Sequence, residues 1–376
     1  MKISPLSVSV ALFPALLMAA PTGDRPDAQH PWAVHDDHRP EAAKVDVPEN
    51  GIPSDAIVLF DGTAESIARN WRDKKGEPSK WTVKDGLFVC TPGSGGAYTR
   101  ERFGDCQLHV EFRIPDPPGP GLGNSGVILQ DRYEVQVLDS FSSTPSPDLR
   151  EQAWTRGGYA DGQAGAIYGQ HPPLVNPCRA PGKWQCYDII FHPPLKEKGR
   201  MVDPGSMTVL MNGVVIQDAW PLEGRCKWRF RPDVKDHAEV GPLRLQDHGH
   251  PVAYRNVWIR RIPSRFADRL TGPGADAAAI AAKRSENAAA ALAWAKTLDN
   301  PEKRLMALAE AWGYEPSDAT RAALEEAAAA SLKAYEKGVE PGPHVRLFAE
   351  MCVRNGIFPK DHPFIVLGLK RPIRYE

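Results

Sequence analysis

The chain lacks three features that would each indicate a particular class of protein. Its 46 lysines and arginines nearly balance its 47 aspartates and glutamates, so composition predicts no electrostatic attraction to nucleic acid or to acidic membranes. No Cys-x-x-Cys pair occurs, which argues against a zinc site built from cysteines. Beyond the N-terminal region no apolar run is long enough to cross a membrane, so we expect no stable membrane span.

The N-terminus has the pattern of a secretory signal. Lys2 precedes a mostly apolar stretch over residues 8–18, and Ala19 and Ala20 then come before a polar segment. We therefore predict a signal peptide over residues 1–20 and a mature protein that is periplasmic or secreted. In such a compartment the cysteines could form disulfides, and Cys178 and Cys186 are near enough in sequence to close one loop.

Composition divides the rest of the chain into three parts. Residues 21–52 are rich in Pro, Asp and His and are predicted to form an extended leader, in which the cluster at 35–38 is a solvated charge run rather than a metal site. Residues 53–265 show short β runs between turns. Residues 266–376 contain Ala-, Glu- and Lys-rich segments typical of helices, so we expect a helical appendage that acts as a packing or spacer module.

The middle part predicts a mainly β fold. Trp81 to Cys90 indicates a hairpin around the turn Asp85-Gly86, and residues 106–114 alternate regularly between apolar and polar side chains. Residues 126–130 and 133–138 indicate a second hairpin. Many short strands joined by short turns predict a sandwich or jelly roll of two antiparallel sheets, followed by the helical appendage.

One predicted strand carries unexpected polar residues. At the strand period of two, Glu134 and Gln136 share a face with Leu138, whereas Asp139 lies on the opposite face. Burying such groups costs roughly 1–3 kcal/mol for each one left without a hydrogen bond. A face that binds sugar hydroxyls would offset this cost, and a solvated face of an antiparallel sheet is the alternative.

Several more polar or glycine-containing clusters fall at strand ends and turns, and together they form a pattern. They are Leu59 to Gly62, Asn124 to Gly126, Gly165 to Gly169, Trp184, Asn212-Gly213, Gln246 to His250 and Arg255-Asn256. With the strand at 133–139 they resemble the 3-keto-disaccharide hydrolase family, over about residues 57–263. The resemblance implies a concanavalin-A-like jelly roll and action on glycosides whose sugar ring carries a ketone at carbon 3.

A ketone at C3 permits a particular route of cleavage. The ketone acidifies the proton on C2, so a base can remove it, and the leaving group on C1 then departs by elimination. Addition of water to the resulting enone completes a net hydrolysis. This route needs a base near pH 7, a donor for the enolate oxygen and an acid for the leaving oxygen. It does not need the paired carboxylates of ordinary glycosidases, and the chain has no Glu-x-Asp-x-Glu strand of the jelly-roll glucanase type.

We assign hypothetical roles on this basis. His248 is the first choice for the base because an unperturbed histidine titrates near 6.5, and Glu134 is the second if burial raises its pKa. Arg255 suits the enolate oxygen, and Tyr168 suits protonation of the leaving oxygen. The substrate-binding candidates are Asn124, Gln136, Gln246, Asp139 and Trp184.

Cofactors and partners follow from the same resemblance. No cofactor is expected, although a divalent ion held by Glu134 and His248 could replace Arg255 as the electrophile. The substrate would be a 3-keto-glycoside, and an upstream sugar 3-dehydrogenase would have to install its ketone. Two alternatives stay open at this point: a non-catalytic, lectin-like carbohydrate-binding module, and a surface protein whose helical part docks a partner.

Overall fold

A computed structural model describes residues 24–27, 30, 32–35, 42–49, 51–119, 121–141, 159–197, 200–230, 238–264 and 277–371. They fall into two compact units: residues 43–264, and the C-terminal helices together with the described part of residues 1–42. The predicted signal peptide and residues 36–38 of the charged cluster lie outside the described residues.

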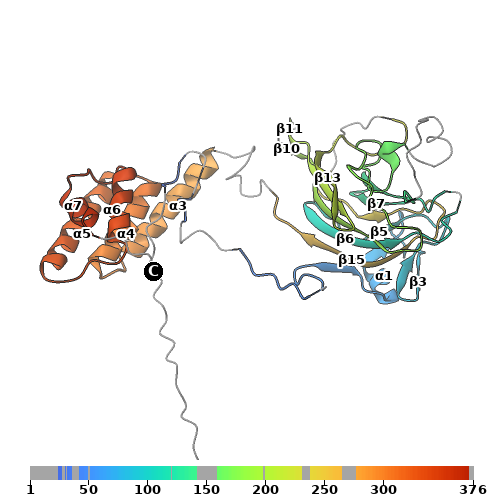
Figure 1. Ribbon diagram of the computed structural model, residues 1–376, viewed down its shortest axis with the longest axis horizontal. Helices are drawn as coiled ribbons and strands as arrows, with labels where there is room; N and C mark the ends of the chain where they lie inside the picture. The colour runs from blue at the N-terminus through green and yellow to red at the C-terminus, as the bar shows by residue number, and fades with distance from the viewer. Residues whose placement is uncertain are drawn as a thin grey trace, which may run out of the picture. The chain divides into compact units, whose positions relative to one another are not determined.

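The unit of residues 43–264 contains two large antiparallel sheets, which Figure 1 shows as two layers. The eight-stranded sheet has the spatial order β13 (Val214–Pro221), β12 (Ser206–Met211), β9 (Gln185–His192), β6 (Cys106–Arg113), β15 (Ala253–Arg261), β4 (Leu87–Val89) and β3 (Thr82–Lys84), and β1 (Ile57–Phe60) also pairs with β15. The five-stranded sheet has the order β2 (Trp71–Arg72), β5 (Ala97–Thr99), β14 (Arg244–Leu245), β7 (Ser125–Leu129) and β8 (Tyr133–Val137). The remaining elements are α1 (Ala64–Asn70), the short helix η1 (Ala160–Gly162) and the pair β10 (Leu195–Glu197) and β11 (Arg200–Asp203).

The apolar core lies between the two sheets. Val110 and Phe112 of β6 and Val135 of β8 are fully buried members of one cluster that both sheets share. Because side chains alternate along a strand, Glu111 and Glu134 point away from that core, to the outer faces of their respective sheets. The predicted sandwich of two antiparallel sheets with C-terminal helices is confirmed.

The predicted hairpins form where their turn residues allow them. Asp85 and Gly86 both have positive φ, 53° and 72°, as the tight turn between β3 and β4 requires. The strands β7 and β8 pair in register from Ser125 opposite Val137 to Leu129 opposite Tyr133. This pairing places Glu134 and Gln136 on β8, the last strand of the five-stranded sheet, opposite Ile128 and Gly126 of β7.

The cysteines do not form the disulfide that their spacing allowed. All six are free thiols. The Cys178 sulfur lies 3.9 Å from that of Met211, and Cys186 lies beside His109 instead of Cys178. In a sheet the side chain of Cys186 is directed by the alternation of β9, so nearness in sequence did not determine its neighbour.

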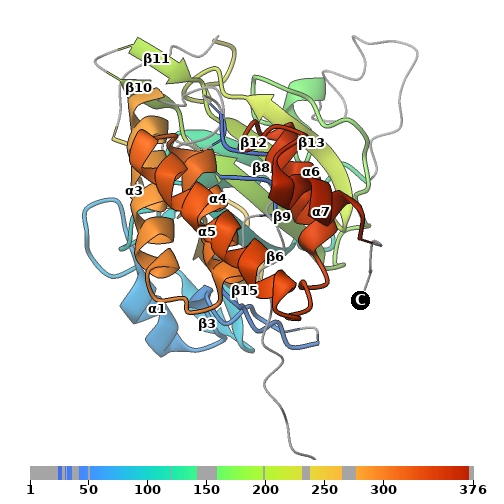
Figure 2. The same cartoon turned by 90° about the vertical axis from the view of Figure 1, so that its left-hand side faces the viewer.

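The C-terminal part is a helical bundle. It comprises α3 (Ala277–Ala295), α4 (Pro301–Tyr314), α5 (Asp318–Glu336), α6 (Val345–Arg354) and α7 (Pro363–Leu369), and Figure 2 shows α3, α4 and α5 side by side. The helix α7 was not predicted, because its seven residues, Pro363–Leu369, are too few to show a helical period. No helix of the described residues is long and apolar enough to span a membrane.

Described leader residues contact this bundle. Arg354 of α6 forms an ion pair with Asp24, with Nε and Oδ1 2.6 Å apart, and the ammonium of Lys283 lies 5.4 Å from the ring centroid of Trp32. Ala33 is buried. Part of the segment predicted to be an extended leader therefore packs on helices that are more than 200 residues away in the chain.

We predict that residues 43–264 fold without the helices. The core between the sheets extends in sequence only from Leu59 to Ile259, and the core of the bundle is a separate cluster from Ala295 to Ile365. A fragment of residues 43–264 should unfold in one cooperative transition in urea and keep its near-ultraviolet circular dichroism. A fragment that binds a hydrophobic dye and shows no transition would contradict this independence.

Candidate functional site

The outer face of the five-stranded sheet carries four of the nine candidate site residues identified in the sequence. Two cross-strand rows of side chains lie on it, and we call this surface the Glu134 face. The first row is Tyr168, Glu134, Ile128, Arg244, Tyr98 and Arg72. The second row is Ala166, Gln136, Gly126 and Gln246. Side chains that are direct neighbours in such a row lie about 5 Å apart, close enough to contact a common ligand.

Glu134 is the most perturbed acid on this face. Its side chain is almost completely buried, and this desolvation raises the pKa of the carboxyl to about 7 although the positive charge of Arg244 opposes the rise. The carboxyl lies over Gly126, where a Cβ atom would come within 2.5 Å of Glu134 Oε1. Glycine at 126 therefore leaves the space that the carboxyl occupies.

Two carboxamide oxygens beside Gly126 have no hydrogen-bond donor among the described residues. They are Gln136 Oε1 and Gln246 Oε1, and both are buried. A buried carbonyl oxygen without a donor costs roughly 1–3 kcal/mol. Hydroxyl groups of a bound ligand would satisfy both oxygens, so the second row has the character of a binding surface rather than of a packed core.

Tyr168 extends the first row beyond the edge of β8. Its backbone N–H donates to the carbonyl of Glu134, and the isolated bridge between Val135 and Ile167 keeps this segment in register. Burial, with the nearby Tyr159 and Glu134, raises the pKa of the Tyr168 hydroxyl to about 12. The hydroxyl therefore stays protonated at neutral pH and can donate a proton or a hydrogen bond.

An aromatic pair adjoins Tyr168. The rings of Tyr159 and Tyr168 both lie next to Gly162, and Trp228 Nε1 donates to the Tyr159 hydroxyl over 3.0 Å. Trp228 is 54% exposed and Tyr159 is 42% exposed. Exposed aromatic rings beside polar side chains are suited to stacking on the apolar face of a sugar ring.

The opposite end of the first row is positively charged. Arg244 contacts Asp131 over 3.0 Å and its guanidinium lies 5.7 Å from the centroid of the Tyr98 ring. A pocket of about 410 Å³ adjoins this end; among the described residues that line it, Asp131 is the single acid. Its basic lining residues are Arg72, Lys74, Arg102, Arg132 and Arg225.

Three other predicted site residues lie at the ends of these strands. His248 is exposed in the turn after β14, and no hydrogen bond or ring contact to it occurs among the described residues. Asn124 directly precedes β7 and is half-buried. Asp139 is buried past the end of β8, where its carboxylate accepts from the Phe141 N–H over 3.1 Å. Asp139 thus supports the turn that follows β8.

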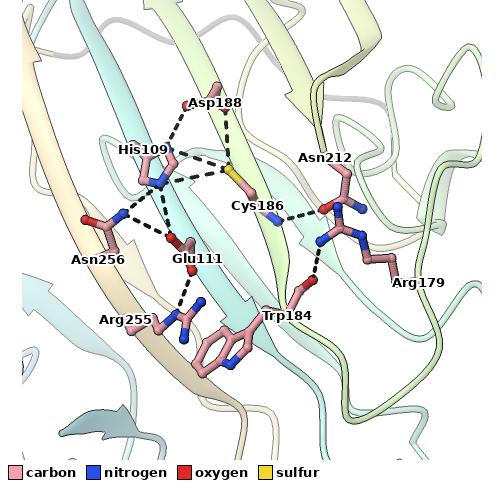
Figure 3. Close-up of polar contacts among 9 residues, drawn as sticks. All are labelled: His109, Glu111, Arg179, Trp184, Cys186, Asp188, Asn212, Arg255 and Asn256. Atoms are coloured by element: carbon pink, nitrogen blue, oxygen red, sulfur yellow. Dashed lines mark hydrogen bonds and ion pairs between the residues drawn. The ribbon is translucent and has the colours of Figure 1, made fainter. Parts of the chain in front are cut away.

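Arg255 and Trp184 do not join this group. Figure 3 shows them on the outer face of the other sheet, where Arg255 Nε donates to Glu111 Oε2 over 2.6 Å and its guanidinium lies 4.0 Å from the centroid of the Trp184 ring. Sheets in a sandwich are about 10 Å apart, with the core between their inner faces. The placement of Arg255 and Trp184 with Glu134 was therefore incorrect, because the neighbouring Tyr254 points into the core and Arg255 must point outward.

The sequence matches a known family over most of the sandwich. Residues 55–260, more than half of the chain, match the model of the 3-keto-alpha-glucoside-1,2-lyase-like domain. The chain belongs to this family. The resemblance inferred from the motifs is thereby confirmed.

Two known proteins are similar to this chain. A 3-keto-disaccharide hydrolase of Bacteroides thetaiotaomicron is 23% identical over 267 residues, which cover 58% of this chain and 83% of the relative. A crystal structure of a candidate glycosyl hydrolase from Parabacteroides distasonis superposes with a TM-score of 0.53 at 38% identity, and covers 61% of this chain and 95% of the other. The match to the family model ends before the helical bundle, so the family name describes the sandwich unit.

Two residues, Arg244 and Gly126, were not assigned to the Glu134 face from the sequence. Arg244 lies two residues before Gln246, so the strand period that grouped Glu134 with Gln136 would also have placed Arg244 on the same face. Gly126 was identified only as the first residue of a predicted strand and as part of the cluster Asn124 to Gly126. Its role beneath the Glu134 carboxyl depends on the register between β7 and β8, which no local pattern specifies.

Proposed function

We propose that this chain cleaves 3-keto-glycosides, including 3-keto-disaccharides, by elimination and rehydration at the Glu134 face. The observation that supports this most is the single buried carboxyl of Glu134, with its pKa near 7, beside two unpartnered carboxamide oxygens. A base that is half-ionised near neutral pH is suited to removing a carbon-bound proton. No other carboxylate stands in the two described rows, which fits elimination better than the two-carboxylate route.

The proposed reaction uses Glu134 as the base, and His248 moves to second place because it is exposed beyond the strand end. Glu134 takes the proton from C2, and the electron pair moves into the ketone to form the enolate. Collapse of the enolate breaks the bond from C1 to the glycosidic oxygen, which receives a proton from Tyr168 or water. Water then adds at C1 and gives its proton back to Tyr168 or to solvent, and Glu134 returns the proton to C2, so the net change is hydrolysis.

The other residues of the face would bind and orient the sugar. Gln136 and Gln246 can accept hydrogen bonds from ring hydroxyls, and their amide N–H groups can donate to the ketone or enolate oxygen. Tyr159 and Trp228 offer exposed rings for the leaving sugar or aglycone. Arg244 replaces Arg255 as the cation nearest to the developing negative charge, because its field already acts on Glu134.

The cellular setting is part of the same proposal. We propose that the mature protein acts in the periplasm or outside the cell, and that an upstream sugar 3-dehydrogenase supplies the ketone. A divalent ion at Glu134 and His248 is an additional proposal that a chelator can test. The proposal requires oxidised sugars as substrates, because an unoxidised sugar lacks the acidic C2 proton.

The decisive experiment incubates the chain with 3-keto-lactose or 3-keto-trehalose beside the unoxidised sugars, with and without EDTA, and measures free sugar. Release from the keto sugars alone is expected. Variants Glu134→Gln and His248→Ala then distinguish the two candidate bases, and the larger loss of turnover should belong to Glu134→Gln. Binding of keto sugars without any release would favour a lectin-like module and overturn the proposal.

A substitution beneath the carboxyl provides a second prediction. In Gly126→Ala the new Cβ would lie 2.5 Å from Glu134 Oε1, so the carboxyl must move. A displacement of about 1 Å in a catalytic group can lower turnover by about 10²-fold, and we expect kcat to fall by 10- to 100-fold. A thermal melt should show that the fold is kept. Unchanged kcat in a folded variant would contradict the proposed position of the base.

A further inference from the structure

A second cluster of reactive side chains lies on the outer face of the eight-stranded sheet. His109 comes from β6, and Cys186 and Asp188 come from β9; their donor atoms all lie within 4.8 Å of one another (Figure 3). Cys186 and Asp188 are two residues apart and share one face of the strand, and His109 is directly opposite Asp188 in the antiparallel pair. Register therefore brings a nitrogen, a sulfur and an oxygen donor together.

We propose that His109, Cys186 and Asp188 bind a divalent cation of the zinc class, with a water molecule in the fourth position. Imidazole, thiolate and carboxylate are the ligand types that Zn²⁺ accepts, and three protein ligands with one open position are typical of zinc sites that exchange a ligand. The thiolate and the carboxylate together balance the two positive charges of the ion. This proposal does not depend on the function proposed for the Glu134 face.

Two of the three donor–donor distances fit tetrahedral coordination. Cys186 Sγ lies 3.7 Å from His109 Nδ1 and 3.5 Å from Asp188 Oδ2. Metal bonds of about 2.0–2.3 Å at tetrahedral angles separate the donor atoms by about 3.4–3.6 Å. One contact must lengthen: His109 Nδ1 and Asp188 Oδ1 are 2.7 Å apart in a hydrogen bond that an ion would replace.

The position of the sulfur argues against a cysteine nucleophile with a histidine base. Cys186 Sγ lies 3.9 Å from His109 Nε2, nearly the same distance as from Nδ1, so the thiol is not directed at either ring nitrogen. In a nucleophilic pair the thiol would approach one nitrogen much more closely than the other. Its hydrogen-bond acceptor here is the carboxylate of Asp188.

Neighbouring residues hold the proposed ligands in place. The His109 ring stacks on Trp258, with centroids 5.0 Å apart and planes at 7°, so the direction of Nδ1 is restricted. Glu111 Oε1 lies 3.8 Å from His109 Nε2, and Arg255 in turn pairs with Glu111. A carboxylate behind a histidine ligand orients the ring and makes it a stronger donor. This gives Arg255 a structural task remote from Glu134.

Binding would redistribute two protons. The Cys186 S–H proton leaves to solvent as the metal–sulfur bond forms. The imidazole proton moves from Nδ1, which binds the ion, to Nε2, where Glu111 can accept it. The Asn256 Nδ2 amide now lies 3.2 Å from His109 Nε2 and would lose this contact, because Nε2 would carry a proton. It would keep its hydrogen bond to Glu111 Oε1. The charges and protons of the site are then balanced.

Cobalt titration of the reduced full-length chain tests the proposal. A thiolate bound to Co²⁺ produces an intense charge-transfer band in the near ultraviolet, and we expect this band to saturate at one equivalent and to disappear when Zn²⁺ is added. Cys186→Ser should abolish it. The matched control Cys178→Ser, at another half-buried cysteine outside the cluster, should keep it. Glu134→Gln should also keep it, which separates this site from any metal at the Glu134 face.

Two outcomes would overturn the proposal. One is the absence of the band at one equivalent of Co²⁺ in the folded chain, and the other is a band that persists in Cys186→Ser. A second variant covers loss of folding in Cys186→Ser: Glu111→Gln leaves all three ligands in place and should weaken Co²⁺ binding by about 10- to 100-fold. Unchanged affinity in Glu111→Gln would contradict the proposed orientation of His109.

Discussion

Glu134→Gln should lower kcat on 3-keto-disaccharides by at least about 10²-fold, the usual contribution of a general base. Glutamine keeps nearly the same volume in the nearly closed space over Gly126 but cannot accept a proton from C2. With native Glu134, whose pKa is about 7, kcat/KM should rise with pH and level off above 7. Initial rates of sugar release between pH 5 and 9 measure both effects.

The matched control is Glu77→Gln, which makes the same chemical change at an exposed turn. It should leave kcat and its pH profile unaltered. If Glu134→Gln retained native turnover while His248→Ala lost it, the base would be His248 and the role proposed for Glu134 would be incorrect. If neither variant lost turnover, the Glu134 face would not be the catalytic site.

The same substitution should stabilise the protein at alkaline pH. Folding raises the pKa of Glu134 from 4.5 to about 7, so the folded state holds this proton more tightly than the unfolded state. The associated stability is fully present below pH 4.5 and is lost as the pH rises to 7. At 1.36 kcal/mol per pH unit the loss is about 3 kcal/mol, and Glu134→Gln avoids it.

Urea denaturation of both proteins at pH 4.5 and pH 8 measures this difference. The free energy of unfolding of Glu134→Gln relative to native should increase by about 3 kcal/mol between the two conditions. Taking the difference between the two proteins cancels the titration of all groups that they share, and Glu77→Gln should show no such increase. A difference that is constant with pH would mean that Glu134 titrates normally in the folded chain.

Local patterns were sufficient to predict the fold, because most strands and turns can be recognised from a few consecutive residues. The alternation in β6 and the Asp85-Gly86 turn depend only on residues that are adjacent in sequence, and the structure forms them as predicted. The segments that became α3 and α5 were equally clear from composition. The short helix α7 was missed because helical periodicity needs more than one or two turns to be visible.

The candidate site was predictable only in part. The strand period correctly grouped Glu134 with Gln136, and the register of β14 with β7 adds Gln246 to them. Arg255 was misplaced because its strand belongs to the other sheet, and a sequence does not state which sheet a strand will join. The two glutamines are polar in any sequence, but that their oxygens are buried without donors is a property of the packed sheet.

The sequence by itself determined the class of fold, the family and the grouping of Glu134 with Gln136 on one face of a strand, since all three depend on short-range patterns. Tertiary structure alone decided the raised pKa of Glu134, because the rise requires burial of the carboxyl. It also decided the contact of His109 with Cys186 and Asp188, because residues 77 positions apart in the chain meet only when β6 and β9 pair in one register. The missing Cys-x-x-Cys motif excludes only metal sites built within one segment. Donors can also meet across a sheet, because strand pairing brings distant residues to within about 5 Å.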